Sequence, residues 1–186
     1  MLFRSYPLNV VFAARMAKQK DPFTFVKALR NLDSELKSKI SVLMVGEGSE
    51  SDKFKRFVRG VGMEKDIKIK DSLSNAGLME FFKGSHIFVL TSHWEGLPIV
   101  VLEAMANGMA VIASDVGGTK EAVDGSCGFL VKRKNVREVK EKLEGLIRDP
   151  AVAQRMGRAG FEKAKKEFSV QRMVEETERV YAEVLK

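Results

Sequence analysis

Short apolar segments alternate with amphipathic segments along the first two thirds of the chain, and this alternation limits the possible folds more than any other feature. The apolar segments are mostly continuous runs of Val, Ile and Leu, as in strands buried on both faces of a parallel sheet. Six such strands are predicted, at residues 8–13, 40–45, 67–69, 87–90, 110–113 and 128–131. Helices are predicted between them and from residue 136 onward. The pattern predicts an α/β domain with a doubly wound, mostly parallel six-stranded sheet of the Rossmann-like kind.

A single domain over residues 1–186 suits a chain of this length. A hydrophobic content of 45% excludes intrinsic disorder. The only cysteine, Cys127, excludes an internal disulfide, and we expect it to be a small core residue rather than a nucleophile. Neither a membrane-spanning run nor a signal peptide is recognisable, so a cytoplasmic protein is expected.

The net charge is +7, with 32 Lys and Arg against 25 Asp and Glu. Such a balance is compatible with nucleic acid, anionic lipid or a phosphorylated ligand as partner. Because the basic residues are interspersed with acids, composition favours an ordinary Lys-rich surface as the explanation of the charge. Charge alone therefore does not assign a function.

In a doubly wound fold the ligand binds beyond the carboxyl ends of the strands, so the loops there are the candidate site. Arg15, Lys18 and Lys20 follow the first strand and could neutralise a phosphate, or be surface charge. Gly46 and Gly48 follow the second strand. They allow either close approach of the backbone to a ligand or simply a tight turn, and the third glycine of a dinucleotide-binding fingerprint is missing.

The most distinctive segment, residues 91–103, runs from a strand into a helix and carries Glu95 and Glu103. Glu103 lies among apolar helix residues, where a carboxylate is costly unless it is paired or hydrogen-bonded. Hydroxyls of a sugar or ribose would satisfy it, and so would a basic neighbour. Gly117 and Gly118 in the next loop again allow close backbone approach or a plain turn. No Asp-x-Asp pair occurs, so a metal bridge to a diphosphate is not indicated.

Taken together and in order, these motifs resemble one family. They are Ala14-Arg15 with Lys20-Asp21, Gly46-Glu47-Gly48, Glu95-x7-Glu103 followed by Ala104-Met105-Ala106-Asn107-Gly108, and Gly117-Gly118-x-x-Glu121. The combination is similar to the C-terminal, donor-binding domain of retaining glycosyltransferase family 4, which has the GT-B architecture. The resemblance extends from about residue 9 to residue 186.

The resemblance implies transfer of a hexosyl group from a nucleotide-diphosphate sugar to a glycan, lipid-linked or small-molecule acceptor, with no metal and no other cofactor. It assigns Arg15 and Lys20 to the donor diphosphate and Glu95 to the hydroxyls of the donor sugar, and these three are the implied catalytic residues. Glu103 would hold the ribose. The implied donor-binding residues are Gly46, Gly48, Ile69, Lys70, Asp71, Gly96, Leu97, Ile99 and Glu103, with backbone of residues 69–72 holding the base.

Family enzymes also have an N-terminal acceptor-binding domain, which these residues do not include. We therefore expect this chain to need that domain, in cis or in trans, and to be inactive alone. A non-catalytic nucleotide- or sugar-binding module acting with a partner chain is the alternative. Nucleic acid is not an expected partner, because no recognised motif for it is present. Peripheral contact with the cytoplasmic membrane face stays open, and the sugar, base and acceptor are not identified.

Overall fold

The computed structural model describes residues 7–185, and its centre is a six-stranded sheet in the order β3-β2-β1-β4-β5-β6. The strands are β1 (Leu8–Ala13), β2 (Ile40–Val45), β3 (Ile67–Lys70), β4 (Ile87–Leu90), β5 (Ala110–Ser114) and β6 (Gly128–Val131). Each neighbouring pair is parallel. This is the doubly wound, Rossmann-like sheet that the sequence predicts. Its order reverses between β1 and β4, which is where such folds bind ligands.

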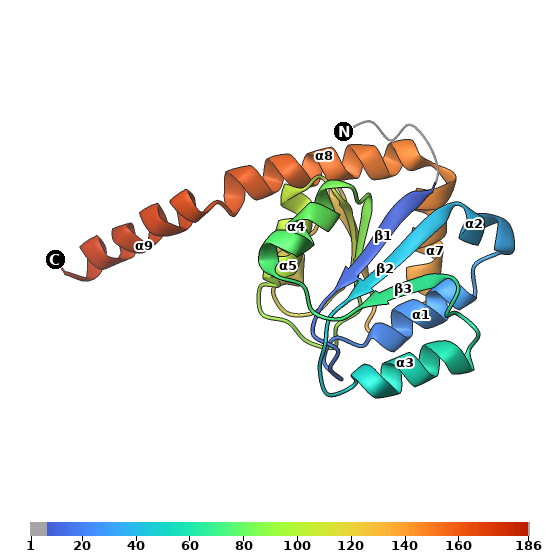
Figure 1. Cartoon of the computed structure of the whole chain (residues 1–186). Helices are drawn as coiled ribbons and strands as arrows, with labels where there is room; N and C mark the ends of the chain where they lie inside the picture. Colours follow the sequence, from blue (N-terminus) through green and yellow to red (C-terminus); the bar gives the residue numbers. More distant parts are fainter. Residues whose placement is uncertain (1–6, 186) are drawn as a thin grey trace.

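Helices cover both faces of the sheet. They are α1 (Pro22–Arg30), α2 (Ser34–Ser38), α3 (Ser51–Gly60), α4 (Asn75–Lys83), α5 (Ile99–Ala106), α6 (Thr119–Ala122), α7 (Val136–Arg148), α8 (Pro150–Glu167) and α9 (Val170–Val184). Figure 1 shows α1 and α3 on one side of the sheet and α4 and α5 on the other. Helix α2 is not predicted from the sequence, because five residues, SELKS, are too short to show a period.

The core is centred on the middle strands. Val10, Phe88 and Ile112, from β1, β4 and β5, are completely buried. Aromatic pairs join the sheet to both helical layers: Phe12 stacks on Phe25 of α1, with ring centroids 6.2 Å apart, and Phe88 meets Phe82 of α4 edge-on at 5.7 Å. Since interiors packed in this way are rigid, the loops at the strand ends are held on a fixed frame.

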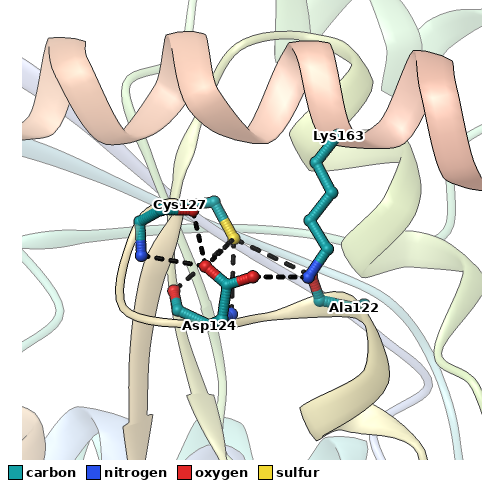
Figure 2. Close-up of polar contacts among 5 residues, drawn as sticks. Ala122, Asp124, Cys127 and Lys163 are labelled. Atoms are coloured by element: carbon teal, nitrogen blue, oxygen red, sulfur yellow. Dashed lines mark hydrogen bonds and ion pairs between the residues drawn. The ribbon is translucent and has the colours of Figure 1, made fainter.

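Helix α8 is fastened to the β5–β6 connection by the polar contacts drawn in Figure 2, where Lys163, Asp124, Cys127 and Ala122 are labelled. Lys163 Nζ lies 2.6 Å from Asp124 Oδ2, and the Ser126 hydroxyl donates to Asp124 Oδ1 at 2.5 Å. The hydrogen bonds from Lys163 and Ser126 hold the pKa of Asp124 far below its ordinary range. Cys127 is fully buried beside them, which confirms it as a core residue.

Helix α9 projects away from the body of the molecule (Figure 1), and none of its residues is buried. Its exposed large apolar side chains are Val170, Met173, Val174, Val180, Tyr181 and Val184. An apolar groove of about 680 Å³ lies between this helix and α5. None of the helices within residues 7–185 is long and apolar enough to cross a membrane.

Candidate functional site

A cleft of about 570 Å³ opens at the carboxyl ends of β1, β2 and β4, on the side covered by α4 and α5. It is lined by Ala13, Ala14, Arg15, Lys20, Val45, Gly46, Ser72, Leu73, Leu78, Glu95, Leu97, Pro98, Ile99, Val100 and Glu103. The lining therefore combines two cations and two carboxylates with mostly apolar walls. A site of this kind suits a ligand that carries both anionic and hydroxyl groups.

The loops after β1 and β2 are joined by backbone hydrogen bonds beyond the sheet. The amide of Met16 donates to the carbonyl of Glu47 at 2.9 Å, and the amide of Glu50 donates to the carbonyl of Met16 at 2.8 Å. Gly46 has φ +142°, and a Cβ there would overlap the carbonyl oxygen of Ala14. Glycine is thus required at position 46 to let the two loops pack, and this packing places Arg15 on the cleft.

Asp21 fixes the end of the β1 loop immediately after Lys20. Its φ is +40°, a left-handed conformation that is uncommon for a residue with a side chain. Asp21 caps helix α1, since its Oδ1 accepts from the backbone amide of Thr24 at 3.4 Å. Its Oδ2 also accepts from the Thr24 hydroxyl at 2.6 Å, and its carbonyl accepts from the Thr91 hydroxyl at 2.7 Å. These bonds hold the strained turn and with it the position of Lys20.

Lys20 and Glu95 meet directly, although they are far apart in sequence. Lys20 Nζ lies 2.5 Å from Glu95 Oε1, which also accepts from the Ser92 hydroxyl at 2.5 Å. The Glu95 side chain is only 7% exposed. One carboxylate is thus oriented by a cation and a hydroxyl, and its position on the cleft wall is defined before any ligand binds.

The loop after β5 supports Glu95 from behind. Gly117 has φ +48°, and a Cβ at this position would overlap the carbonyl oxygen of Glu95. The amide of Gly118 donates to the carbonyl of Gly96 at 3.1 Å. Gly117 and Gly118 therefore allow close approach of the backbone rather than only a plain turn, and the group that approaches is the backbone of the β4 loop.

Glu103 lies on α5 and faces the same cleft, with no ion pair or hydrogen bond to its carboxylate from any residue between 7 and 185. Burial raises the pKa of this carboxyl above its ordinary value. Of the two sequence hypotheses, the buried ion pair with a basic neighbour is therefore wrong. The carboxylate is free to accept hydroxyl hydrogen bonds from a ligand.

The N-terminus of α5 also borders the cleft through Pro98, Ile99 and Val100. No side chain caps this end of the helix. Unsatisfied amides at a helix N-terminus carry partial positive charge and favour anions. Arg15, which forms no ion pair with any described residue, adds a full positive charge on the facing wall.

Seven of the twelve predicted site residues line the cleft: Arg15, Lys20, Gly46, Glu95, Leu97, Ile99 and Glu103. The other five do not. Gly48 packs against the carbonyl of Met16, and Gly96 accepts the hydrogen bond from Gly118. Ile69 and Lys70 belong to β3, where Lys70 Nζ lies 4.6 Å from the ring centroid of Phe81. Asp71 pairs with Lys55 at 2.8 Å.

Of the predicted base-holding segment, residues 69–72, only Ser72 reaches the lining, followed by Leu73 and then Leu78 of α4. The two leucines are missed by the sequence analysis, because an apolar residue beside a strand end carries no motif. Among residues 7–185, no group of three or more His, Cys, Asp and Glu side chains is placed to hold a metal ion. The absence of metal from the reaction stays a prediction.

The fold is an α/β domain of the Rossmann-like type, with a cleft lined by two cations and two carboxylates at the reversal point of the sheet. Residues 3–163 match the family "Glycosyl transferases group 1", and the chain belongs to this family. Its structural neighbours are glycosyltransferases of the GT-B type.

Two relatives illustrate the family. Alpha-maltose-1-phosphate synthase of Mycobacterium tuberculosis is 32% identical over 183 residues, covering 94% of this chain and 47% of the relative. D-inositol 3-phosphate glycosyltransferase of an Arthrobacter species is 30% identical over 155 residues, covering 81% and 37%. The chain thus spans about half the length, or less, of the relatives it matches.

Solved structures share the fold. Sucrose-phosphate synthase from Thermosynechococcus elongatus superposes with a TM-score of 0.88 at 22% identity, covering 96% of this chain and 46% of that one. Anabaena Alr3699/HepE in complex with UDP superposes with a TM-score of 0.85 at 21% identity, covering 96% and 49%. In both cases the shared region is about half of the larger protein.

Proposed function

We propose that this chain is the donor-binding domain of a retaining, family 4 glycosyltransferase that transfers a hexosyl group from a nucleotide-diphosphate sugar. One observation carries the proposal. Two cations, Arg15 and Lys20, and two carboxylates, Glu95 and Glu103, come from three separate segments and line the same cleft. A nucleotide sugar presents a diphosphate, a ribose and a hexose in a row, and these side chains are complementary to each part.

The cations match the charge that the reaction releases. Breaking the bond between the sugar and the diphosphate leaves negative charge on the leaving phosphate oxygens. This charge would be stabilised by the cations Arg15 and Lys20 and by the backbone dipoles at the uncapped N-terminus of α5. Catalysis is most effective when such groups are already in place before the reaction begins. In this proposal no metal ion and no other cofactor takes part.

The carboxylates are proposed to bind hydroxyl groups. Glu103 is free, so ribose hydroxyls that donate to it would offset the cost of its burial. Glu95 is already fixed by Lys20 and Ser92, so its second oxygen is available in a defined direction for hydroxyls of the hexose. Ser72, Leu73 and Leu78 close the cleft beyond Glu103 and would lie against the base.

Comparisons support the ligand class. Anabaena Alr3699/HepE has the same fold and was solved with UDP, with UDP and glucose, and with UDP-glucose. The pneumococcal O-GlcNAc transferase GtfA, TM-score 0.82 at 22% identity, was solved with UDP and GlcNAc. We therefore choose UDP and UDP-glucose as the first probes.

An N-terminal acceptor-binding domain, in cis or in trans, is part of the proposal. The chain spans about half of each relative, and the large apolar side chains of α9 are exposed. An apolar helix face of this size is expected to be covered in a complete protein. The chain alone is then expected to bind the donor and to be inactive, in a cytoplasmic setting with peripheral membrane contact left as an option.

Binding of UDP to the purified chain tests the proposal. Saturating UDP should raise the melting temperature, because a ligand at 100 times its dissociation constant stabilises the folded state by about 2.7 kcal/mol. Glu103→Ala should weaken UDP binding more than Glu95→Ala, since only Glu103 is assigned to the ribose. Glu141→Ala, at an exposed position on α7, is the control and should bind UDP normally.

Folded protein that shows no shift with any nucleoside diphosphate would overturn the proposal. Calorimetric titrations in which Glu95→Ala loses more UDP affinity than Glu103→Ala would reject the residue assignment. Hexosyl transfer that appears only after an N-terminal domain is added would favour the enzyme over a non-catalytic binding module.

A further inference from the structure

The sheet opens at the point where the donor cleft lies. Strands β1 and β4 are neighbours, but their ladder is short, with residues 10–11 of β1 beside residues 87–88 of β4. Strand β1 is by contrast paired with β2 along all of its six residues. In doubly wound sheets the loops on either side of the strand-order reversal lead apart and leave a crevice. The β1 loop and the β4 loop, which carry the two members of the ion pair on the cleft wall, therefore need contacts outside the sheet to stay together.

These two loops are joined by hydrogen bonds of Gln19, the residue before Lys20. The carbonyl of Gln19 accepts from the amide of His93 at 2.7 Å. The side-chain amide of Gln19 donates to the carbonyl of Trp94 at 2.9 Å. Gln19 thus holds the β4 loop through its backbone and through its side chain, at the two residues that precede Glu95.

The side-chain bond fixes the peptide unit that leads into Glu95. The carbonyl of Trp94 and the amide of Glu95 belong to one planar peptide unit, so a bond that orients the first also orients the second. The next peptide unit, that of the Glu95 carbonyl, is packed closely against Gly117 of the loop after β5. The backbone of Glu95 is therefore held on both sides, and Gln19 provides one of these two contacts.

Neither direct contact with a ligand nor the stability of the fold accounts for the Gln19 side chain. Gln19 lies outside the lining of the donor cleft. Its bond to the Trp94 carbonyl is exposed, so water can replace the amide there at little cost in free energy. A neutral, exposed hydrogen bond between two loops of a site is better explained by the orientation that it imposes on the loop carrying Glu95.

The direction of the Glu95 carboxylate depends on its backbone, because Lys20 and Ser92 both bind the same carboxylate oxygen, Oε1. In the proposed function the other oxygen accepts from hexose hydroxyls. Hydrogen bonds weaken steeply when they are misaligned, and a group that is already oriented binds without the cost of being ordered first. A small turn of the Glu95 peptide would therefore weaken contacts with the sugar more than those with the diphosphate.

We propose that Gln19 is a positioning residue for hexosyl transfer. Its side-chain amide, by fixing the peptide unit between Trp94 and Glu95, directs the Glu95 carboxylate towards the donor sugar. The inference rests on the proposed function and adds a residue to which the family resemblance gives no role. Gln19 acts through Glu95 and touches neither the sugar nor the diphosphate. Its loss should therefore weaken sugar binding selectively, and only while Glu95 is present.

Gln19→Met tests the proposal, because methionine has a similar length and no charge but cannot donate to the Trp94 carbonyl. In calorimetric titrations of the full chain we expect UDP-glucose to bind about fivefold more weakly, and UDP to bind within about twofold of wild type. Gln171→Met is the matched control. The Gln171 amide also makes an exposed hydrogen bond, to Glu175 on α9 at 2.9 Å, and its loss should change neither affinity.

A double-mutant cycle with Glu95→Ala separates positioning from direct contact. When the Glu95 carboxylate is already absent, adding Gln19→Met should weaken UDP-glucose by less than about twofold. A further loss of about fivefold in the Glu95→Ala background would show that Gln19 acts on the donor independently, and would overturn the proposal. Equal UDP-glucose affinities in Gln19→Met and Gln171→Met would overturn it as well.

Trp94 reports on the same hydrogen bond, since it is the only tryptophan in the sequence. Loss of the bond to its carbonyl should lower the fluorescence anisotropy of Trp94 in Gln19→Met, with the melting temperature within about 2 °C of wild type. A lower melting temperature with an unchanged ratio of UDP-glucose to UDP affinity would make Gln19 a structural residue only. Folded wild-type protein that binds no UDP contradicts the donor-binding function. Normal UDP binding, with UDP-glucose affinity unaffected by Gln19→Met, contradicts only the positioning role.

Discussion

Two clusters in this molecule are built from the same three groups, a lysine, a carboxylate and a serine. At the cleft, Glu95 accepts from Lys20 and Ser92, each at 2.5 Å. At helix α8, Asp124 accepts from Lys163 at 2.6 Å and from Ser126 at 2.5 Å (Figure 2). Both lysine side chains are 15% exposed, whereas the side chain of Glu95 is 7% exposed and that of Asp124 is 50% exposed. The two clusters therefore contain the same donors and acceptors, but their carboxylates differ in burial.

Their surroundings differ. The Asp124 cluster joins α8 to the β5–β6 connection and is backed by the buried thiol of Cys127, so its groups are used within the protein. The Glu95 cluster lies on the wall of a cleft that also contains Arg15 and Glu103, neither of which has an ion-pair partner among residues 7–185. The Glu95 ion pair belongs to a candidate binding site because of the unpaired charges beside it, and not because of its own geometry.

Removing the lysine charge from the cleft should give the largest effect on binding. Lys20→Gln keeps a donor near Glu95 but loses the cation assigned to the diphosphate. We expect UDP affinity to fall by about 100-fold, equivalent to about 2.8 kcal/mol, and the melting temperature to fall as well, because the buried carboxylate of Glu95 loses its cation. Calorimetric titration and thermal unfolding measure the two quantities. An unchanged UDP affinity would mean that the two clusters do not differ in function.

The matched change at α8 should act on stability alone. Lys163→Gln weakens the charge-assisted hydrogen bond to Asp124, and because the Asp124 side chain is 50% exposed and screened by water, we expect a loss of about 1 kcal/mol in the free energy of unfolding. For a chain of this size that corresponds to a fall of about 2–4 °C in melting temperature. UDP affinity should stay at the wild-type value. A loss of UDP affinity as large as that of Lys20→Gln would show that α8 is coupled to the cleft.

The pH dependence of the Lys163→Gln effect is a separate check. The pKa of Asp124 is lowered in the folded state, chiefly by Lys163, so the stabilisation is present above the unfolded value of 3.8 and is lost as pH falls below it. The difference between wild type and Lys163→Gln should therefore shrink in acid. A difference that stays constant down to pH values well below 3.8 would contradict the assigned cause.

The fold follows from the sequence almost completely, and the site follows in part. Continuous apolar strands and amphipathic helices report burial directly, so the strand positions and the sheet are predictable. Arg15, Lys20 and the two glutamates are recognisable because they match motifs of the family that the sequence resembles. The ion pair between Lys20 and Glu95 and the lack of a partner for the Glu103 carboxylate both depend on how loops distant in sequence pack together. No local sequence pattern encodes this packing.

The glycines show the same limit. Glycines in these loops predict that the backbone packs closely against another group, but the sequence does not identify that group. Gly46 allows the carbonyl of Ala14 to pack, and Gly117 allows the carbonyl of Glu95 to pack. In both places the partner is another loop of the site. These glycines position the functional side chains, and the cleft residues Leu73 and Leu78 carry no signal at all.

The serines offer a finer comparison with smaller effects. Ser92→Ala and Ser126→Ala each remove one hydrogen bond to a carboxylate, and each should cost about 1 kcal/mol of stability. Only Ser92→Ala should also change binding, because Glu95 is assigned to the donor sugar. We expect about fivefold weaker UDP-glucose and unchanged UDP. Equal losses for both ligands would move Glu95 from the sugar to the diphosphate.

Glu103→Gln in the ligand-free protein should give the smallest effect on stability, and this effect depends on pH. Burial raises the pKa of the Glu103 carboxyl in the folded state above its ordinary value of 4.5. As pH rises, this carboxyl therefore loses its proton first in the unfolded state. The unfolded state then binds fewer protons, so ionisation of Glu103 lowers the free energy of unfolding between 4.5 and the raised value and leaves it lower at neutral pH. Glu103→Gln removes this loss, and the ligand-free variant should gain stability over wild type at pH 7 and lose that gain below pH 4.5. The exposed control Glu141→Gln breaks a surface ion pair and should show no such gain. If the gain of Glu103→Gln over wild type is no larger at neutral pH than in acid, the carboxylate of Glu103, like that of Asp124, is already satisfied within the protein. The contrast between the Glu95 cluster and the Asp124 cluster would then lose the free carboxylate on which it chiefly rests.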